Sequence, residues 1–255
     1  PQFSHLGDLF LSPNLEKLQI FEKPRVDIKT QGGLLDVSFD FSGIYENDID
    51  NALTALFNNE AYFISEAGNL IVFDEETQKI SDALQNLRAK KLTNGHLQLD
   101  TISTFQVSEL LGDSGSVHFS KEFQQLALDL AHPEKFDIPL PQVNAELREY
   151  QEIGIRWMSM LDNYGFGGVL ADDMGLGKTL QTISFLVSKL KPSTRVLILS
   201  PSSLIYNWKD EFSKFAPAID VVVSYGLKPI RDEIISSNHQ IVITSYSSFR
   251  QDFEE

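Results

Sequence analysis

Three continuous apolar runs in the second half of the sequence, each next to a helical pattern, constrain the fold most. They read RVLILS, DVVVSYG and QIVITSY. A strand that is apolar at every position is typical of a parallel sheet that is buried on both faces. With GGVLA at 167–171 as a further strand, strand and helix alternate four times with short connections, which predicts right-handed crossovers. We therefore predict an α/β fold with a parallel sheet and flanking helices over residues 146–255.

The first half of the chain has a different pattern of short, mixed elements. LLDVSFDF at 34–41 alternates apolar and polar residues, which predicts a half-buried strand. AYFISEAGNLIVFD at 61–74 predicts a hairpin about a Gly-Asn turn. Four further segments have amphipathic helical spacing: ENDIDNALTALFNN, DEETQKISDALQNLRAK, ISTFQVSELLGD and SKEFQQLALDLAH. We predict a smaller α+β accessory domain over residues 1–135, followed by a proline-containing linker over residues 136–145.

Charge is distributed unevenly between the two halves. The chain carries a formal net charge of −15. Residues 1–140 hold 10 Lys and Arg against 22 Asp and Glu, so this half is a poor partner for nucleic acid and a better one for a protein. The sequence has no cysteine, which excludes disulfides and thiolate metal sites. No apolar stretch approaches the length needed to cross a bilayer, so we expect no membrane partner.

The segment LADDMGLGKTLQT at 170–182 has the composition of a phosphate-binding loop. Gly175 and Gly177 allow a sharp turn that exposes backbone N–H groups to an anion, and a helix that begins at Lys178 adds positive dipole character. The ammonium group of Lys178 could reach the β- and γ-phosphates, and the hydroxyl of Thr179 could ligate Mg²⁺. The alternative is a glycine-rich turn that only caps a helix.

The same segment resembles the phosphate loop of Swi/Snf-type DNA-dependent ATPases, a branch of helicase superfamily two. The general pattern G-x-x-x-x-G-K-[ST] has a glycine where this chain has Asp172, and that branch typically carries an acidic residue there. The resemblance implies a RecA-like lobe that binds ATP with Mg²⁺, with Lys178 and Thr179 as the catalytic residues. The implied nucleotide-binding residues are Gln151, Asp172, Asp173, Met174, Gly175, Leu176, Gly177, Lys178 and Thr179.

Three other segments match the same family in the expected order. LREYQEIGIRW at 147–157 resembles its adenine-recognition element, which implies that Gln151 reads the adenine edge through its amide. VLILSPSSLIYNWKDEF and IVITSYSSF resemble loops that touch the phosphates of double-stranded DNA. The implied DNA-binding residues are Pro201, Ser202, Ser203, Thr244, Ser245 and Tyr246. Helix capping by the serines and a buried strand end at Thr244 are the structural alternatives, and Trp208 is expected in the core.

The stretches LDVSFDFSG, FDEETQKI and AHPEKF lie within residues 1–140, which resemble the end of the accessory region that precedes the ATPase core in some bacterial members of this family. The resemblance implies a cytoplasmic, nucleoid-associated bacterial DNA translocase, of which these 255 residues are a part. We find no second acidic motif of the Asp-Glu-Ala-His kind and no second lobe, so we expect this segment alone to be inactive. An incomplete parallel sheet would leave an open edge, which favours self-association or docking of the accessory domain.

Two other functions remain open from the sequence. A metabolic kinase would share only the phosphate loop, without the Gln151 element or the paired downstream loops. A protein-interaction or regulatory module with a vestigial nucleotide site would explain the acidic accessory domain better than a DNA-binding role does.

Overall fold

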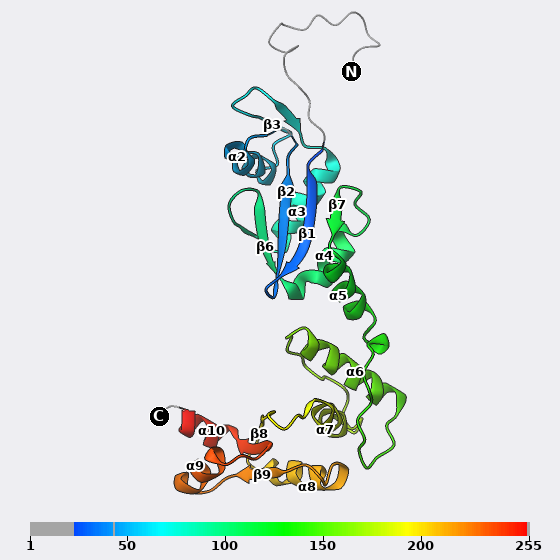
Figure 1. Ribbon diagram of the computed structural model, residues 1–255, viewed down its shortest axis with the longest axis vertical. Helices are drawn as coiled ribbons and strands as arrows, with labels where there is room; N and C mark the ends of the chain where they lie inside the picture. The colour runs from blue at the N-terminus through cyan, green and yellow to red at the C-terminus, as the bar shows by residue number, and fades with distance from the viewer. Residues whose placement is uncertain (1–22, 43, 254–255) are drawn as a thin grey trace, which may run out of the picture. The chain divides into compact units, whose positions relative to one another are not determined.

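The computed structural model describes residues 23–42 and 44–253, and these form two compact units, one ending at Ala131 and the other beginning at His132. The first unit, coloured blue to green in Figure 1, is built on a mixed sheet of strand order β5-β6-β2-β1-β7. Its strands are β1 (Arg25–Gln31), β2 (Leu34–Asp40), β5 (Lys90–Lys91), β6 (His96–Asp100) and β7 (Val117–Phe119). Neighbouring strands are antiparallel except β1 and β7, which are parallel.

Helices cover this sheet and complete one core. They are α2 (Glu46–Phe57), α3 (Glu75–Asn86), α4 (Thr104–Leu111) and α5 (Lys121–Ala131), with a short 3-10 turn at Thr101–Ser103. The alternation predicted at 34–41 is confirmed, because Leu35, Val37 and Phe39 are buried in a cluster that also contains Leu53 of α2 and Leu84 of α3. The strands of this unit follow from apolar residues at every second position, and its helices from apolar residues at every third or fourth position.

Two predicted turn features of the first unit are confirmed. The hairpin consists of β3 (Tyr62–Ile64) and β4 (Leu70–Val72), which pair antiparallel, and Gly68 between them has a φ of 85° that favours glycine. Ser120 directly precedes the helical pattern KEFQQLALDLA, a position that predicts an N-cap. Its hydroxyl accepts a hydrogen bond from Phe123 N at 3.2 Å, so Ser120 caps α5.

Glu76 of α3 connects three separate parts of the first unit. Its carboxylate accepts hydrogen bonds from Ser114 Oγ at 2.5 Å and Ser116 N at 3.1 Å, and it bonds Lys23 Nζ at 3.2 Å. The hydrogen bond from Ser114, together with those from Ser116 and Lys23, lowers the pKa of Glu76 from 4.5 to about 2. The folded state therefore binds this proton more weakly than the unfolded state does.

We expect Glu76→Gln to lower the free energy of unfolding of the chain near neutral pH. The folded pKa lies below the unfolded one, so the carboxylate stabilises the fold fully above pH 4.5 and loses this effect as pH falls toward 2. The loss at pH 7 should be about 1 kcal/mol, because a side chain that is 32% exposed is partly screened by solvent. Urea unfolding at several pH values tests this. Glu75→Gln, at an exposed neighbouring position, is the control. A difference in the free energy of unfolding between wild type and Glu76→Gln that does not decrease in acid would contradict the prediction.

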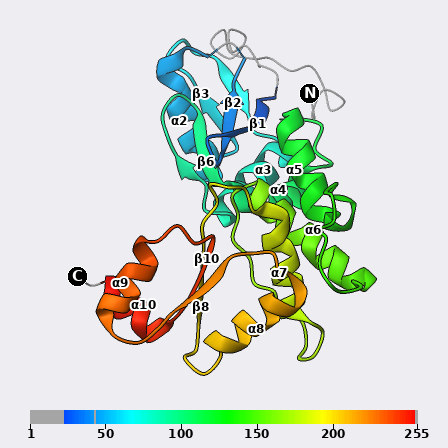
Figure 2. The same ribbon diagram turned by 60° about the horizontal axis from the view of Figure 1, so that its bottom comes forward.

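The second unit contains a parallel sheet of strand order β8-β10-β9. Its strands are β8 (Val196–Ser200), β9 (Val221–Ser224) and β10 (Ile241–Ser245). Its helices are α6 (Glu149–Asn163), α7 (Lys178–Lys189), α8 (Ile205–Phe215), α9 (Lys228–Ser236) and α10 (Tyr246–Phe253). In Figure 2, α8, α9 and α10 lie beside the strands, and α6 lies against α7. The predicted alternation of helix and parallel strand is confirmed for these three strands.

The core of the second unit lies between the sheet and helices α7 and α8. Ile198 of β8 and Ile243 of β10 pack with Ile183 of α7 and Phe212 of α8 in one buried cluster. Trp208 is partly buried against this cluster, as the sequence predicts, with its ring 6.4 Å from that of Phe212. This packing sets the position of the N-terminus of α7 relative to α8.

The strand predicted at 167–171 is wrong, because the structure has no strand there and Val169 is 82% exposed. A strand needs a neighbour that accepts its backbone hydrogen bonds. Among the described residues β8, β10 and β9 pair only with one another, so none is available to 167–171. The prediction that β8 is buried on both faces is also wrong, since Leu197 is 49% exposed.

The α6 helix also differs from its predicted orientation. The spacing of ELREYQEIGIRWMSMLDNY predicts an inward face made of Leu147, Tyr150, Gly154, Trp157, Met158 and Leu161. In the structure Tyr150 and Trp157 are only half-buried, whereas Gln151, Ile155 and Met160 are buried. The buried face is therefore turned by about one residue from the expected one. Of its two buried polar residues, Gln151 and Ser159, the first is explained by its contact with the loop that precedes α7.

The segment predicted as a linker is attached to the second unit. Phe136 O accepts a hydrogen bond from Arg156 Nη1 at 2.8 Å, and Asn144 N donates to Phe215 O at 2.8 Å. In the described ranges, no helix is long and apolar enough to span a membrane.

Candidate functional site

The loop before α7 is shaped by two glycines in the left-handed region of backbone conformation. Gly175 has a φ of 85° and Gly177 a φ of 76°, values at which a side chain would be strained. Gly177 is the N-cap of α7 and has no side chain to accept a hydrogen bond from the first turn. Among the described residues, therefore, the N-cap position offers no side-chain oxygen to the first N–H groups of α7, which is the arrangement that an anion can complete.

The backbone carbonyl of Leu176, between the two glycines, is the point at which the loop is held. Tyr150 Oη donates to it at 3.2 Å and Gln151 Nε2 at 3.1 Å, both from α6, and Gln181 Nε2 of α7 lies at 3.5 Å. In a trans peptide the C=O and N–H point in opposite directions, and the described residues contain no cis peptide bond. The N–H of Gly177 consequently points away from the donors on α6.

Gln181 links this carbonyl to the acidic part of the loop. Its Nε2 donates to Asp172 Oδ2 at 2.9 Å, and its side chain is completely buried. Gly154 on α6 makes room for this amide, since a Cβ there would lie 2.0 Å from Gln181 Oε1. The carboxylate of Asp172, which replaces the glycine of the general pattern, thus braces the loop. The pattern of the sequence did not reveal Gln181, because a glutamine one turn into a helix is usually solvated.

Lys178 is held against the loop by the carbonyl oxygens of two preceding residues. Its Nζ donates to Asp172 O at 2.7 Å and to Asp173 O at 2.9 Å. These bonds keep the ammonium group above the loop at the N-terminus of α7. Phosphate oxygens would be stronger acceptors for it than these neutral carbonyls, because both partners are then charged.

A cavity of about 540 Å³ lies next to the loop. The loop and the start of α7 contribute Met174, Gly175, Gly177, Lys178 and Thr179 to its lining. The facing wall comes from α8 and the residue before it, with Leu204, Asn207, Trp208, Glu211 and Phe215. This volume is within the range of small-ligand sites. The sequence did not indicate the α8 wall, which depends on how α7 and α8 pack.

The structure brings five of the predicted nucleotide-binding residues together at this cavity and places the others around it. Gln151 contacts the loop through Leu176 but does not line the cavity, and Asp172 and Asp173 contact Lys178 through their carbonyls. Their roles toward a nucleotide stay predictions.

The predicted DNA-binding residues follow two neighbouring parallel strands. Ser200 at the end of β8 pairs with Ser245 at the end of β10, so the residues after these strands lie at the same edge of the sheet. Pro201, Ser202 and Ser203 are exposed there, and Tyr246 is 59% exposed. Within the part of the chain that the structure describes, neither serine hydroxyl is hydrogen-bonded, so the helix-capping alternative is not observed for them.

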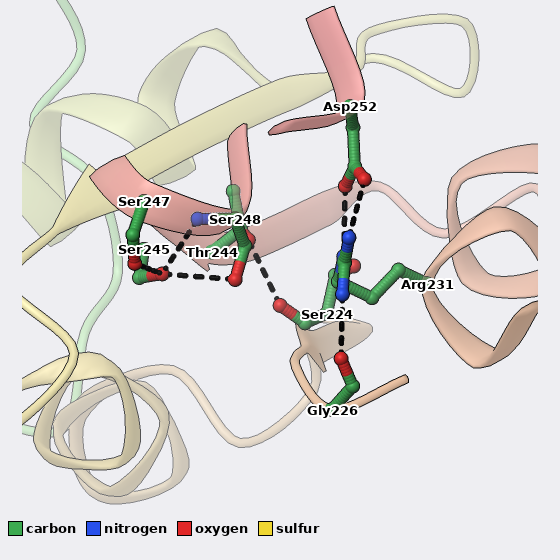
Figure 3. A network of polar contacts seen from close by, with 8 residues as sticks. All are labelled: Ser224, Gly226, Arg231, Thr244, Ser245, Ser247, Ser248 and Asp252. Atoms are coloured by element: carbon green, nitrogen blue, oxygen red, sulfur yellow. Dashed lines mark hydrogen bonds and ion pairs between the residues drawn. The ribbon is translucent and has the colours of Figure 1, made fainter. Parts of the chain in front are cut away.

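Thr244 and Ser245 are buried, unlike Tyr246, and Figure 3 shows the contacts of their hydroxyls. Thr244 Oγ1 donates to Ser224 O at 2.8 Å, which connects β10 to β9. Ser245 Oγ accepts from Ser248 N at 3.1 Å and contacts the hydroxyls of Ser247 and Ser248 at 3.0 Å, so it organises the start of α10. Both hydroxyls make hydrogen bonds inside the protein. For Thr244 this agrees with the buried strand end that the sequence left open as an alternative.

A buried ion pair holds α10 against α9 behind this edge. Arg231 Nε and Nη2 bond both carboxylate oxygens of Asp252 at 2.9 and 2.5 Å, and Nη1 donates to Gly226 O at 2.5 Å (Figure 3). The two side chains are 7% and 12% exposed. The hydrogen bonds from the Arg231 guanidinium keep the pKa of Asp252 below its ordinary value. Tyr246 is therefore at the start of a helix that this ion pair holds in place.

Two family descriptions match this chain. Residues 1–141 match the family described as "Bacterial SNF2 helicase associated", and residues 150–255 match the "SNF2-related domain". The first match covers more than half of the chain, and the second covers the loop, the cavity and the edge of the sheet described above.

Individual relatives agree with these matches. The chain is 30% identical to "Uncharacterized ATP-dependent helicase MG018" of Mycoplasma genitalium, over 98% of this chain and 25% of that protein. It is 38% identical to "TATA-binding protein-associated factor mot1" of Aspergillus fumigatus, over 52% of this chain and 8% of that protein. The chain thus spans a quarter or less of the length of these two relatives. Among solved structures, it is similar to "Sulfolobus solfataricus SWI2/SNF2 ATPase core in complex with dsDNA", with 37% identity over 44% of this chain and 24% of that one, at a TM-score of 0.39.

Proposed function

This chain belongs to the bacterial SNF2 helicase-associated family and carries an SNF2-related domain after that region, and we propose that its second unit is the nucleotide-binding part of a Swi/Snf-type, DNA-dependent ATPase lobe. The parallel sheet β8-β10-β9 would then be part of a RecA-like lobe. The observation that carries the proposal is the loop before α7, where the Leu176 carbonyl is bonded to α6 and the N-terminus of α7 has no side-chain cap.

In this proposal the triphosphate binds at the N-terminus of α7. The first-turn N–H groups and the N–H of Gly177 donate to phosphate oxygens, and Lys178 moves from the carbonyls of Asp172 and Asp173 to the β- and γ-phosphates. The hydroxyl of Thr179 lines the cavity and, among the described residues, has no hydrogen-bond partner, so it is available as a ligand of Mg²⁺. The ion would neutralise charge on the phosphates.

The side-chain amide of Gln151 keeps an unused donor and an unused acceptor for the predicted role with adenine. Its Oε1 accepts from Arg148 N at 3.0 Å and its Nε2 donates to Leu176 O at 3.1 Å. A primary amide has two N–H donors and two acceptor positions on its oxygen, so one of each remains. We propose that Gln151 holds the phosphate loop through Leu176 O and the start of α6 through Arg148 N, and reads the adenine edge with the remaining donor and acceptor.

For double-stranded DNA, we propose that the exposed residues at the sheet edge make the contacts. Ser202, Ser203 and Tyr246 can offer hydroxyl and backbone N–H donors to phosphates without reading sequence. Thr244 and Ser245 would support this edge from inside, since their hydroxyls are occupied. The acidic first unit is the poorer candidate for DNA contact.

The test is the rate of ATP hydrolysis with and without double-stranded DNA, measured on the longer protein that contains these residues and on the 255-residue segment. We expect DNA to stimulate the longer protein and the segment alone to turn over negligibly, because the sequence of the segment has no second acidic motif. Rapid ATP hydrolysis by the 255-residue segment would contradict the expectation that only the longer protein is active. A longer protein that binds neither ATP nor DNA would instead support the interaction module with a vestigial site, which the acidic first half favours.

The DNA part of the proposal has its own matched variants. Replacing Ser202 and Ser203 with glutamate should weaken DNA binding by the longer protein and remove most of the DNA stimulation, because two negative charges then face the phosphates. Ser213→Glu, on the exposed side of α8, is the control and should leave both unchanged. Equal effects of the two changes would mean that the sheet edge is not the contact.

A further inference from the structure

The β3–β4 hairpin of the first unit is apolar on both of its faces. Phe63 and Ile71 face inward, and Ile71 is part of the buried core. The outer face consists of the two other cross-strand pairs, Tyr62 with Val72 and Ile64 with Leu70. Strands at a surface normally alternate apolar and polar residues, so an outer face of four apolar side chains requires a separate explanation.

This outer face is accessible in the described structure. Tyr62 is 53% exposed, Ile64 48% and Val72 45%, and Leu70 is partly buried. The hairpin is also anchored at its turn, where Glu66 N donates to the buried carboxylate of Asp48 at 3.0 Å. We call these four side chains the hairpin face. A contiguous apolar face on a fixed element is typical of an interaction site.

The charge around the hairpin face has a single sign along the chain. Residues 60–76 contain five Asp and Glu and no Lys or Arg. Glu60, Glu66 and Glu75 are exposed, and Lys23 pairs with the other two, Asp74 at 2.5 Å and Glu76 at 3.2 Å. The hairpin therefore presents apolar side chains bordered by carboxylates.

We propose that the hairpin face binds a Lys- or Arg-rich segment of a partner protein whose apolar side chains alternate with its basic ones. Apolar residues of such a segment would cover Tyr62, Ile64 and Val72, and its cations would meet the exposed glutamates. An extended segment fits because every second residue of a strand points to the same face, as Tyr62 and Ile64 do here. The charge argues against DNA phosphates and anionic lipid, and it opposes a second copy of the same acidic face.

This inference goes beyond the proposed function and does not depend on the nucleotide site. It can be tested on the 255-residue chain with a fluorescent twelve-residue peptide that alternates lysine with isoleucine, by anisotropy. We expect binding that weakens with salt. The double variant Tyr62→Thr, Val72→Thr should weaken it by about tenfold, because central apolar contacts provide most of the affinity of such interfaces. Threonine keeps a high preference for strands, so the hairpin should still form.

Matched controls make the outcome decisive. Ile102→Thr removes another exposed apolar side chain of the first unit, which is 68% exposed, and should leave binding unchanged. A peptide with glutamate for lysine, and one with serine for isoleucine, should both bind weakly. The proposal is overturned if the glutamate peptide binds equally well, or if Ile102→Thr weakens binding as much as the double variant. It is also overturned if sedimentation shows a dimer of the chain that the double variant dissociates.

Discussion

We expect Lys178→Ala in the longer protein to lower ATP turnover by about 10²–10³-fold, the usual effect of removing one positioned donor to a charge that develops in the transition state. The reason is local. Lys178 is the only cation that lines the cavity beside the loop in the described structure. Its Nζ is held at the loop by hydrogen bonds to the carbonyl oxygens of Asp172 and Asp173. ATP affinity should fall by about 10- to 100-fold, since a hydrogen bond to a charged group contributes about 1.5–3 kcal/mol.

Two measurements distinguish this effect from a loss of folding. Lys189→Ala removes a lysine at the other end of α7, which pairs with Asp162 at 2.8 Å, and should leave turnover unchanged. Thermal unfolding of the 255-residue chain should change little with Lys178→Ala, because the lost partners are loop carbonyls that water can satisfy. A Lys178→Ala protein that binds ATP with unchanged affinity would rule out this loop as the triphosphate site.

Gly177→Ala has the second large expected effect, and its size relative to Gly175→Ala is the informative quantity. Both positions have positive φ, so each alanine costs about 1–2 kcal/mol of backbone strain. At Gly175 a Cβ meets nothing within 4 Å, whereas at Gly177 it would lie 2.6 Å from Gln151 Nε2. Only Gly177→Ala therefore displaces the amide that holds the Leu176 carbonyl.

We expect both variants to lower the melting temperature of the chain, and Gly177→Ala to lower it further. In the longer protein, Gly177→Ala should weaken ATP binding at least tenfold more than Gly175→Ala, because the N–H of Gly177 then loses its fixed direction. Combining Gly177→Ala with Gln151→Ala removes the steric conflict, so part of the thermal loss should return while ATP binding stays weak. If the two glycine variants behave alike, the bond between Gln151 and Leu176 has no role in ordering the loop.

The elements that could be predicted are those whose residues carry their own periodicity or cap. The hairpin at 61–74, the alternating strand at 34–41 and the helix beginning at Lys178 depend on neighbours in sequence, and the structure confirms them. The segment at 167–171 has the composition of a strand but no partner among the described strands. Apolar composition alone therefore did not predict a strand correctly, because a strand also requires a neighbouring strand to accept its backbone hydrogen bonds.

The same distinction applies to the candidate site. The order Gly-Leu-Gly-Lys-Thr by itself indicates a phosphate loop, because glycine, lysine and threonine at that spacing have few structural uses. Gln181, the role of Gln151 as a loop donor and the α8 wall of the cavity were not predictable. Each depends on the packing of α7 against α6 or α8, and side-chain amides give no pattern in sequence that distinguishes a buried brace from a solvated surface residue.

The sequence by itself determined the family and the α/β character of the second unit, and it predicts phosphate binding by residues 172–179, because these depend on residue types at fixed local spacing. Only the tertiary structure decided which hydroxyls at the sheet edge are exposed, which donors hold the Leu176 carbonyl and which face of the hairpin is left uncovered. The physical reason is that burial and hydrogen-bond partners are set by residues distant in the chain, such as Tyr150 for Leu176 and Ser224 for Thr244.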